Sequence, residues 1–93
     1  MFDSLTIHGA AANILWGYRP AAVLRSWRIY KRDGQWMLDA RVERVELFMC
    51  RQKGLLFTAP HEKSRDGFWA WSVEGEVQVS PTRLVAKLGP PEQ

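Results

Sequence analysis

A β-hairpin centred on Asp33-Gly34 is the feature that most constrains how this chain can fold. Two runs of alternating residues flank the dipeptide, residues 27–32 before it and residues 35–42 after it. Asp-Gly between such runs predicts a type I′ turn, because both central residues of that turn need a positive φ. The sequence therefore predicts an antiparallel pair of strands over residues 27–42.

The register that this turn imposes is chemically consistent. It predicts three cross-strand pairs, which are Ile29 with Leu38, Trp27 with Ala40, and Arg28 with Asp39. Two of the pairs are apolar and lie on one face, whereas the third joins opposite charges on the other face. One face of the hairpin is therefore expected to be buried and the other to face solvent.

Size limits how the chain can build a core. Its 93 residues predict a single domain, residues 1–93. A domain this short buries only about two-thirds of the surface of its unfolded chain, so its core needs large side chains. The chain has five Trp, four Phe and two Tyr, and Trp69 and Trp71 share one face of a predicted strand. We expect this pair to fill the core.

Further short strands are predicted on both sides of the hairpin. They cover residues 4–8, 55–59, 68–73, 76–80 and 83–88, and one runs from about residue 23 into the hairpin. Residues 9–22 stay without a definite assignment, since residues 14–18 fit a strand or one helical turn. Pro20 predicts a boundary.

Turn signals near the C-terminus predict a second hairpin. A turn at residues 81–82 sets Val79 opposite Leu84 and Glu76 opposite Lys87. Residues 74–75 predict a turn or bulge upstream, and residues 89–91, Gly-Pro-Pro, are expected to end the last strand.

One helix is predicted, over about residues 43–53. Four residues have helical spacing, namely Val45, Phe48, Met49 and Gln52. Gly54 follows where a C-terminal cap belongs. The β-branched residues Val42 and Val45 are the competing signal, because they favour a longer strand.

These elements define the predicted fold class. It is α+β and predominantly β: a curled antiparallel sheet or a partly open small barrel of six to eight short strands, with one helix.

No pattern in the sequence points to catalysis. The chain lacks the nucleophile-elbow, zinc-protease, phosphate-loop and dinucleotide-binding motifs. His61 and Glu62 are adjacent in a polar connection, where such residues are usually solvated. Two His and one Cys, widely spaced, are a poor set of metal ligands. We therefore expect no enzyme activity, no cofactor, no metal and no small-molecule substrate.

The cysteine content and the length of the apolar runs indicate in which cellular compartment the protein is expected. Cys50 is the single cysteine, which excludes an intramolecular disulfide and favours a buried, inert thiol. The N-terminus has no signal-peptide pattern, and no apolar stretch approaches the ~18 residues of a membrane span. A cytoplasmic, intracellular protein without a membrane partner is expected.

The solvent-facing side of the first hairpin carries positive charge around an aromatic residue. Arg28, Tyr30, Arg32 and Arg41 fall on this side, and Lys63 and Arg65 in the polar connection add to them. These residue types contact phosphates and stack on bases, which makes a nucleic-acid-binding barrel the alternative hypothesis. The net charge of +3 is modest, and Asp39 projects into the same face.

Protein binding is the favoured hypothesis. Aromatic and Arg residues dominate interface hot spots, and the chain is rich in both. An incompletely closed sheet also leaves an edge for a partner's strand. The sequence thus predicts a small accessory or assembly subunit, of a kind common among intracellular and virus-encoded proteins, and a homodimer as its simplest form.

Overall fold

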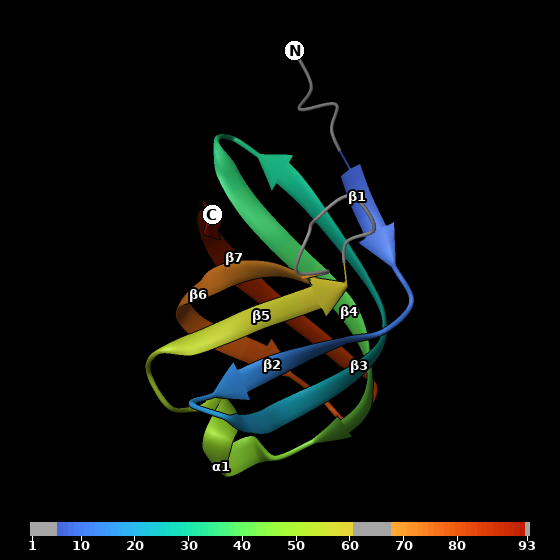
Figure 1. The fold of residues 1–93 in the computed structure, drawn as a ribbon, viewed down its shortest axis with the longest axis vertical. Helices are drawn as coiled ribbons and strands as arrows, with labels where there is room; N and C mark the ends of the chain where they lie inside the picture. The colour runs from blue at the N-terminus through green and yellow to red at the C-terminus, as the bar shows by residue number, and fades with distance from the viewer. Residues whose placement is uncertain (1–5, 61–67, 93) are drawn as a thin grey trace.

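The computed structural model describes residues 6–60 and 68–92 of the chain (Figure 1). This part is mostly β, with one short helix, which confirms the predicted fold class. The elements are β1 (Thr6–Gly9), β2 (Ala12–Trp16), β3 (Arg19–Arg32), β4 (Gln35–Val45), α1 (Leu47–Cys50), β5 (Leu55–Pro60), β6 (Phe68–Val79) and β7 (Arg83–Glu92).

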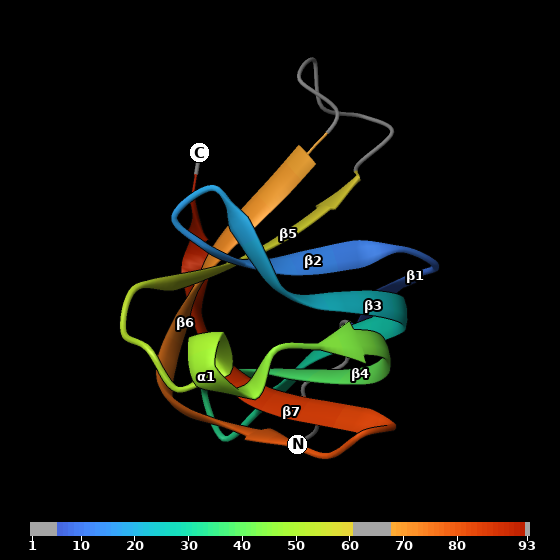
Figure 2. The same ribbon diagram turned by 90° about the horizontal axis from the view of Figure 1, so that it is seen from below.

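Six of the strands close into an antiparallel barrel. β2, β3, β4, β7, β6 and β5 are neighbours in that order, and β5 pairs back with β2. Figure 2 shows these strands arranged around the core. β1 is an additional strand, which pairs with the C-terminal half of the long β3. Closure leaves few free sheet edges, and β1 presents one of them.

The hairpin between β3 and β4 is confirmed in both turn and register. Asp33 and Gly34 have φ values of 51° and 79°, as a type I′ turn requires. All three predicted pairs form, so that Ile29 faces Leu38, Trp27 faces Ala40 and Arg28 faces Asp39.

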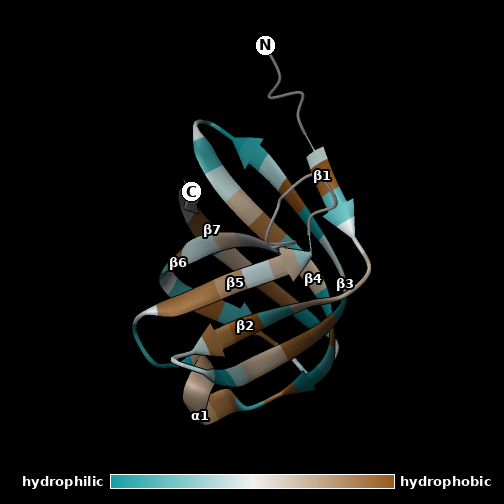
Figure 3. Ribbon diagram, in the orientation of Figure 1, coloured by the Kyte–Doolittle hydropathy of each residue, from teal (hydrophilic) through white to brown (hydrophobic). Residues whose placement is uncertain are grey.

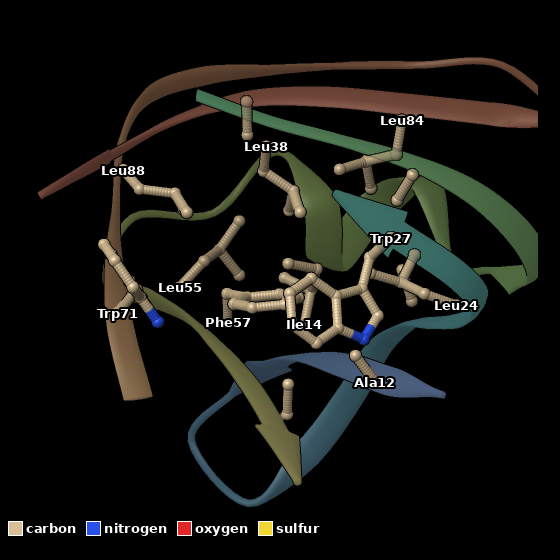
Figure 4. Packing of buried hydrophobic residues seen from close by; sticks show 14 of the residues in the cluster. Ala12, Ile14, Leu24, Trp27, Leu38, Leu55, Phe57, Trp71, Leu84 and Leu88 are labelled. Carbon is tan, nitrogen blue, oxygen red and sulfur yellow. The ribbon is translucent and has the colours of Figure 1, made fainter. Parts of the chain in front are cut away.

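Inward-facing side chains of every barrel strand fill the core (Figure 4). Figure 3 shows that each barrel strand carries hydrophobic residues. Phe57 on β5 is fully buried and meets Trp27 edge to face, with ring centroids 5.3 Å apart. Trp71 on β6 is 2% exposed and makes a similar contact with Trp36. The prediction that Trp71 belongs to the core is confirmed, whereas the side chain of Trp69 lies outside the described part.

The predicted helix over residues 43–53 is wrong in extent. β4 continues to Val45, with Val42 opposite Leu24 and Val45 opposite Ala22. Only Leu47–Cys50 is helical. The β-branched valines prefer the extended backbone, and cross-strand pairing with β3 outweighs the helical spacing.

The boundaries before the hairpin also differ from the prediction. Residues 12–16 form a strand, and β3 begins at Arg19 instead of near residue 23, so that Pro20 lies inside it. The register between β2 and β3 shifts at Ile14 and Leu15, where Leu15 faces Pro20. Such an irregularity accommodates a residue that cannot donate a ladder hydrogen bond.

The C-terminal hairpin is confirmed near its turn and wrong farther along. Val79 faces Leu84 as predicted, but Lys87 faces Glu74 instead of Glu76, because the register shifts between Glu74 and Gln78. Gly75 in this irregularity has a φ of 68°.

β7 also runs past the point where it was expected to end. It continues to Glu92, with Pro91 opposite Trp71 of β6. Its pairing with β4 stops where Leu88 faces Trp36. A proline is tolerated there, because β7 has lost its neighbour on the β4 side and has become an edge.

Candidate functional site

The outer face of the barrel over β3, β4 and β7 collects basic side chains. Cross-strand pairing sets Ser26, Arg41 and Arg83 in one row, and the next row along the strands contains Arg28 and Asp39. We call this surface the basic face and define it by Arg28, Tyr30, Arg32, Arg41, Arg83 and Lys87.

Asp39 holds two arginines of the basic face. Arg83 donates two hydrogen bonds in a fork, from Nε to Oδ1 at 3.0 Å and from Nη2 to Oδ2 at 2.7 Å. Arg28 donates a longer bond from Nη2 to Oδ2, at 3.3 Å. The hydrogen bonds from Arg83 lower the pKa of Asp39, against the opposing effect of its partial burial. The carboxylate therefore stays ionised at neutral pH and orients both guanidinium groups.

Two guanidinium groups contact the ring of Tyr30. Arg28 and Arg32 precede and follow it by two residues on β3, and their Cζ atoms lie 5.1 and 5.4 Å from the ring centroid. Both distances are those of cation–π contacts. The strand thus presents an alternating row of arginine, tyrosine and arginine.

A hollow of about 460 Å³ indents the surface between β1 and the basic face. Its polar lining consists of His8, Ser26, Thr82, the arginines Arg28, Arg41 and Arg83, and one carboxylate, Asp39, which is paired with Arg28 and Arg83. None of the ion pairs in residues 6–60 and 68–92 involves Arg41. Hydroxyl, imidazole and guanidinium groups around one hollow favour an anionic ligand.

The structure brings together four of the six site residues that the sequence predicted. Arg28, Tyr30, Arg32 and Arg41 share the outer side of the β3–β4 hairpin. Lys63 and Arg65, together with His61 and Glu62, lie outside the described residues. The sequence analysis missed Arg83 and Lys87, because their place beside β4 depends on the long-range pairing of β7, for which no local pattern exists.

A second surface is apolar and lies where α1 closes one end of the barrel. Phe48 and Leu47 on α1 are 66% and 49% exposed, and Tyr18 in the β2–β3 turn is fully exposed. Trp16 of β2 meets Phe48 edge to face, with centroids 6.1 Å apart. Figure 1 shows α1 and the β2–β3 turn at this same end. We call this surface the apolar end and define it by Trp16, Tyr18, Leu47 and Phe48.

The exposure of Phe48 corrects the sequence analysis. The predicted helix placed Phe48 in its apolar stripe, where it would face the core. With α1 reduced to Leu47–Cys50, only Cys50 of that helix is buried. The signal that could have identified this surface is the run of three apolar residues, Leu47 to Met49, which exceeds what a one-turn helix can bury.

Cys50 is the residue of α1 that is buried in the core, as predicted. Its Sγ lies 3.4 Å from the carbonyl oxygen of Ala21, to which it donates, and it forms no disulfide. Burial raises the pKa of the thiol, with a smaller contribution from Glu46. The thiol is therefore protonated at neutral pH and a poor nucleophile.

The described residues contain no cluster of three or more His, Cys, Asp or Glu able to hold a metal ion. No helix in the same residues is long and apolar enough to cross a membrane. The chain matches no protein-family model, and comparisons with curated proteins and with solved structures find no significant match.

Proposed function

We propose that this chain is a non-enzymatic interaction module that binds a protein partner through the apolar end, and that this partner is a second copy of the chain. The observation that carries the proposal is the exposure of Phe48 and Leu47 next to Trp16. Aromatic residues gathered at one place on a small domain are typical of an interface.

The energetics favour covering this surface. Burying a Phe or Leu side chain stabilises by about 1.5–3 kcal/mol, and Phe48 and Leu47 on α1 stay 66% and 49% exposed. The contact with Trp16 holds the ring of Phe48 against the barrel. A partner therefore meets a partly ordered aromatic surface, which lowers the entropic cost of association.

The charges around the apolar end support a second copy as the partner. Glu43, Arg44 and Glu46 precede α1 with one net negative charge, Arg51 and Lys53 follow it, and all five are exposed. In a twofold dimer the same patch meets itself, so the acidic side of one copy can face the basic side of the other. The edge of β1 is a weaker candidate, because that strand has only four residues.

Sedimentation velocity over a range of concentrations tests the proposal. The wild-type chain should move from the monomer mass of 10.7 kDa towards twice that value as concentration rises. Phe48→Ser should stay monomeric and folded, since the side chain contributes to the exposed end and little to the core.

Met37→Ser is the matched control, because Met37 is a half-buried apolar residue on β4, facing Lys87 of the basic face. This variant should associate like the wild type. A wild-type chain that stays at 10.7 kDa throughout, or a Phe48→Ser variant that associates normally, would overturn the proposal.

A further inference from the structure

The basic face carries an excess of positive charge that the described residues of the chain do not neutralise. Among its five cationic side chains, Arg28 and Arg83 pair with Asp39 on the same surface. Lys87 faces Glu74, which lies at the border of this surface. Arg41 and Arg32 have no ion-pair partner among the described residues. Such a concentration of one sign on one side attracts a polyanion.

Arg28 and Arg83 bind Asp39, but each still has N–H donors that can bind a second acceptor. The side chains of Arg28 and Arg83 are 56% and 64% exposed, and Asp39 occupies one nitrogen of Arg28 and two of Arg83. A guanidinium group has five N–H donors. Asp39 therefore fixes the direction of these groups and leaves donors free to bind phosphate.

The arrangement around Tyr30 distinguishes among polyanions. A carbohydrate sulfate or polyphosphate needs only charges, whereas a base can stack on a tyrosine ring or on a guanidinium plane. The row of Arg28, Tyr30 and Arg32 offers planar groups of both kinds beside the hollow lined by Arg41. Bases are available for stacking in a single strand and not inside a duplex.

We infer that the basic face binds single-stranded nucleic acid, with phosphates at Arg41, Arg83 and Arg28 and a base at Tyr30. This interface lies on the outer side of β3, β4 and β7, whereas the apolar end is formed by α1 and the β2–β3 turn. Binding of nucleic acid at the basic face does not depend on self-association through the apolar end. The two are tested by different measurements, oligonucleotide binding and oligomeric mass.

Fluorescence anisotropy of a labelled homopyrimidine strand of roughly 12 nucleotides, measured at several salt concentrations, tests the inference. Binding should weaken as salt rises. Arg41→Gln should weaken it further and reduce the slope of log K against log salt by about 0.7, the value for one phosphate contact in a single strand. Arg19→Gln removes an equal, exposed charge at the start of β3, outside the basic face, and should leave the slope unchanged.

Substitutions at Tyr30 distinguish the binding of nucleic acid from the binding of other polyanions. Tyr30→Leu should weaken oligonucleotide binding about fivefold or more, since one stacked base contributes about 1–3 kcal/mol. Tyr30→Phe keeps the ring and should bind like the wild type. Binding of heparin fragments should not change with either variant.

Three results would overturn the inference. They are the absence of oligonucleotide binding by the wild type at low salt, equal effects of Arg41→Gln and Arg19→Gln, and unchanged affinity in Tyr30→Leu. The last result, with heparin bound as tightly as the oligonucleotide, would identify the surface as a general polyanion site.

Discussion

Gly9 on β1 and Trp27 on β3 are cross-strand partners, and the indole ring of Trp27 occupies the space that a side chain on Gly9 would need. A β-carbon added at Gly9 would lie 2.6 Å from Cζ2 of Trp27 and 2.8 Å from Cε2. The extra strand β1 can therefore cover this buried indole only with glycine at its last position.

Gly9→Ala should destabilise the protein by about 1–3 kcal/mol, the usual cost of overpacking a well-packed site. Trp27 is 5% exposed, so its ring cannot simply swing into solvent. Urea unfolding monitored by circular dichroism measures the change.

A double-mutant cycle with Trp27→Phe provides the control. Phe lacks the second ring that meets Gly9, so Gly9→Ala should cost much less in the Trp27→Phe background. Equal costs in both backgrounds would show that the indole is not the obstacle.

Gly34→Val should destabilise the β3–β4 hairpin by about 1–3 kcal/mol, because a β-branched residue is strained at positive φ. Apart from the two neighbouring residues in the chain, no part of the described protein lies within 4 Å of the position where a Cβ on Gly34 would be, so the cost is that of the backbone conformation. Gly34→Asn tolerates this conformation and should cost distinctly less. Thermal unfolding measures the stability of both variants. Equal melting temperatures would contradict the type I′ assignment.

The ion pairs of Asp39 should make stability depend on pH. Because its pKa is lowered in the folded state, ionised Asp39 stabilises the fold above the unfolded pKa of about 3.9. That contribution is lost as the pH falls through the lower, folded pKa. Asp39→Asn should therefore be less stable than wild type at about pH 7, and the difference should shrink below about pH 4.

Glu76→Gln is the control for this pH dependence. It removes an exposed carboxyl group that takes part in none of the ion pairs in the described part of the chain, so it should change stability little at either pH. A difference between Asp39→Asn and wild type that persists unchanged in acid would contradict the assigned ion pairs.

Local chemistry explains which parts of the fold could be predicted. The turn at Asp33 and Gly34 determines the register of the strands beside it, so the pairs across β3 and β4 follow directly from the sequence. The stretch from Val42 to Met49 carries two conflicting signals, β-branching and helical spacing. Pairing with β3, which depends on the whole barrel, decides between them.

The two surfaces also differ in how much of each could be predicted from the sequence. Arg28, Tyr30, Arg32 and Arg41 could be placed on one face from the hairpin alone. The contribution of Arg83 required the pairing of β7 with β4, and strands so distant in sequence give no local indication of contact. The apolar end was missed for another reason, since the exposure of Phe48 depends on where the helix begins and ends.

Amide chemical shifts measured by NMR over a range of protein concentrations test the central claim most directly. If two copies meet through the apolar end, the shifts of α1 and of the β2–β3 turn should move with concentration, while those of the basic face stay constant. Shifts that move only along β1, or that do not move anywhere at the highest concentration, would contradict this account.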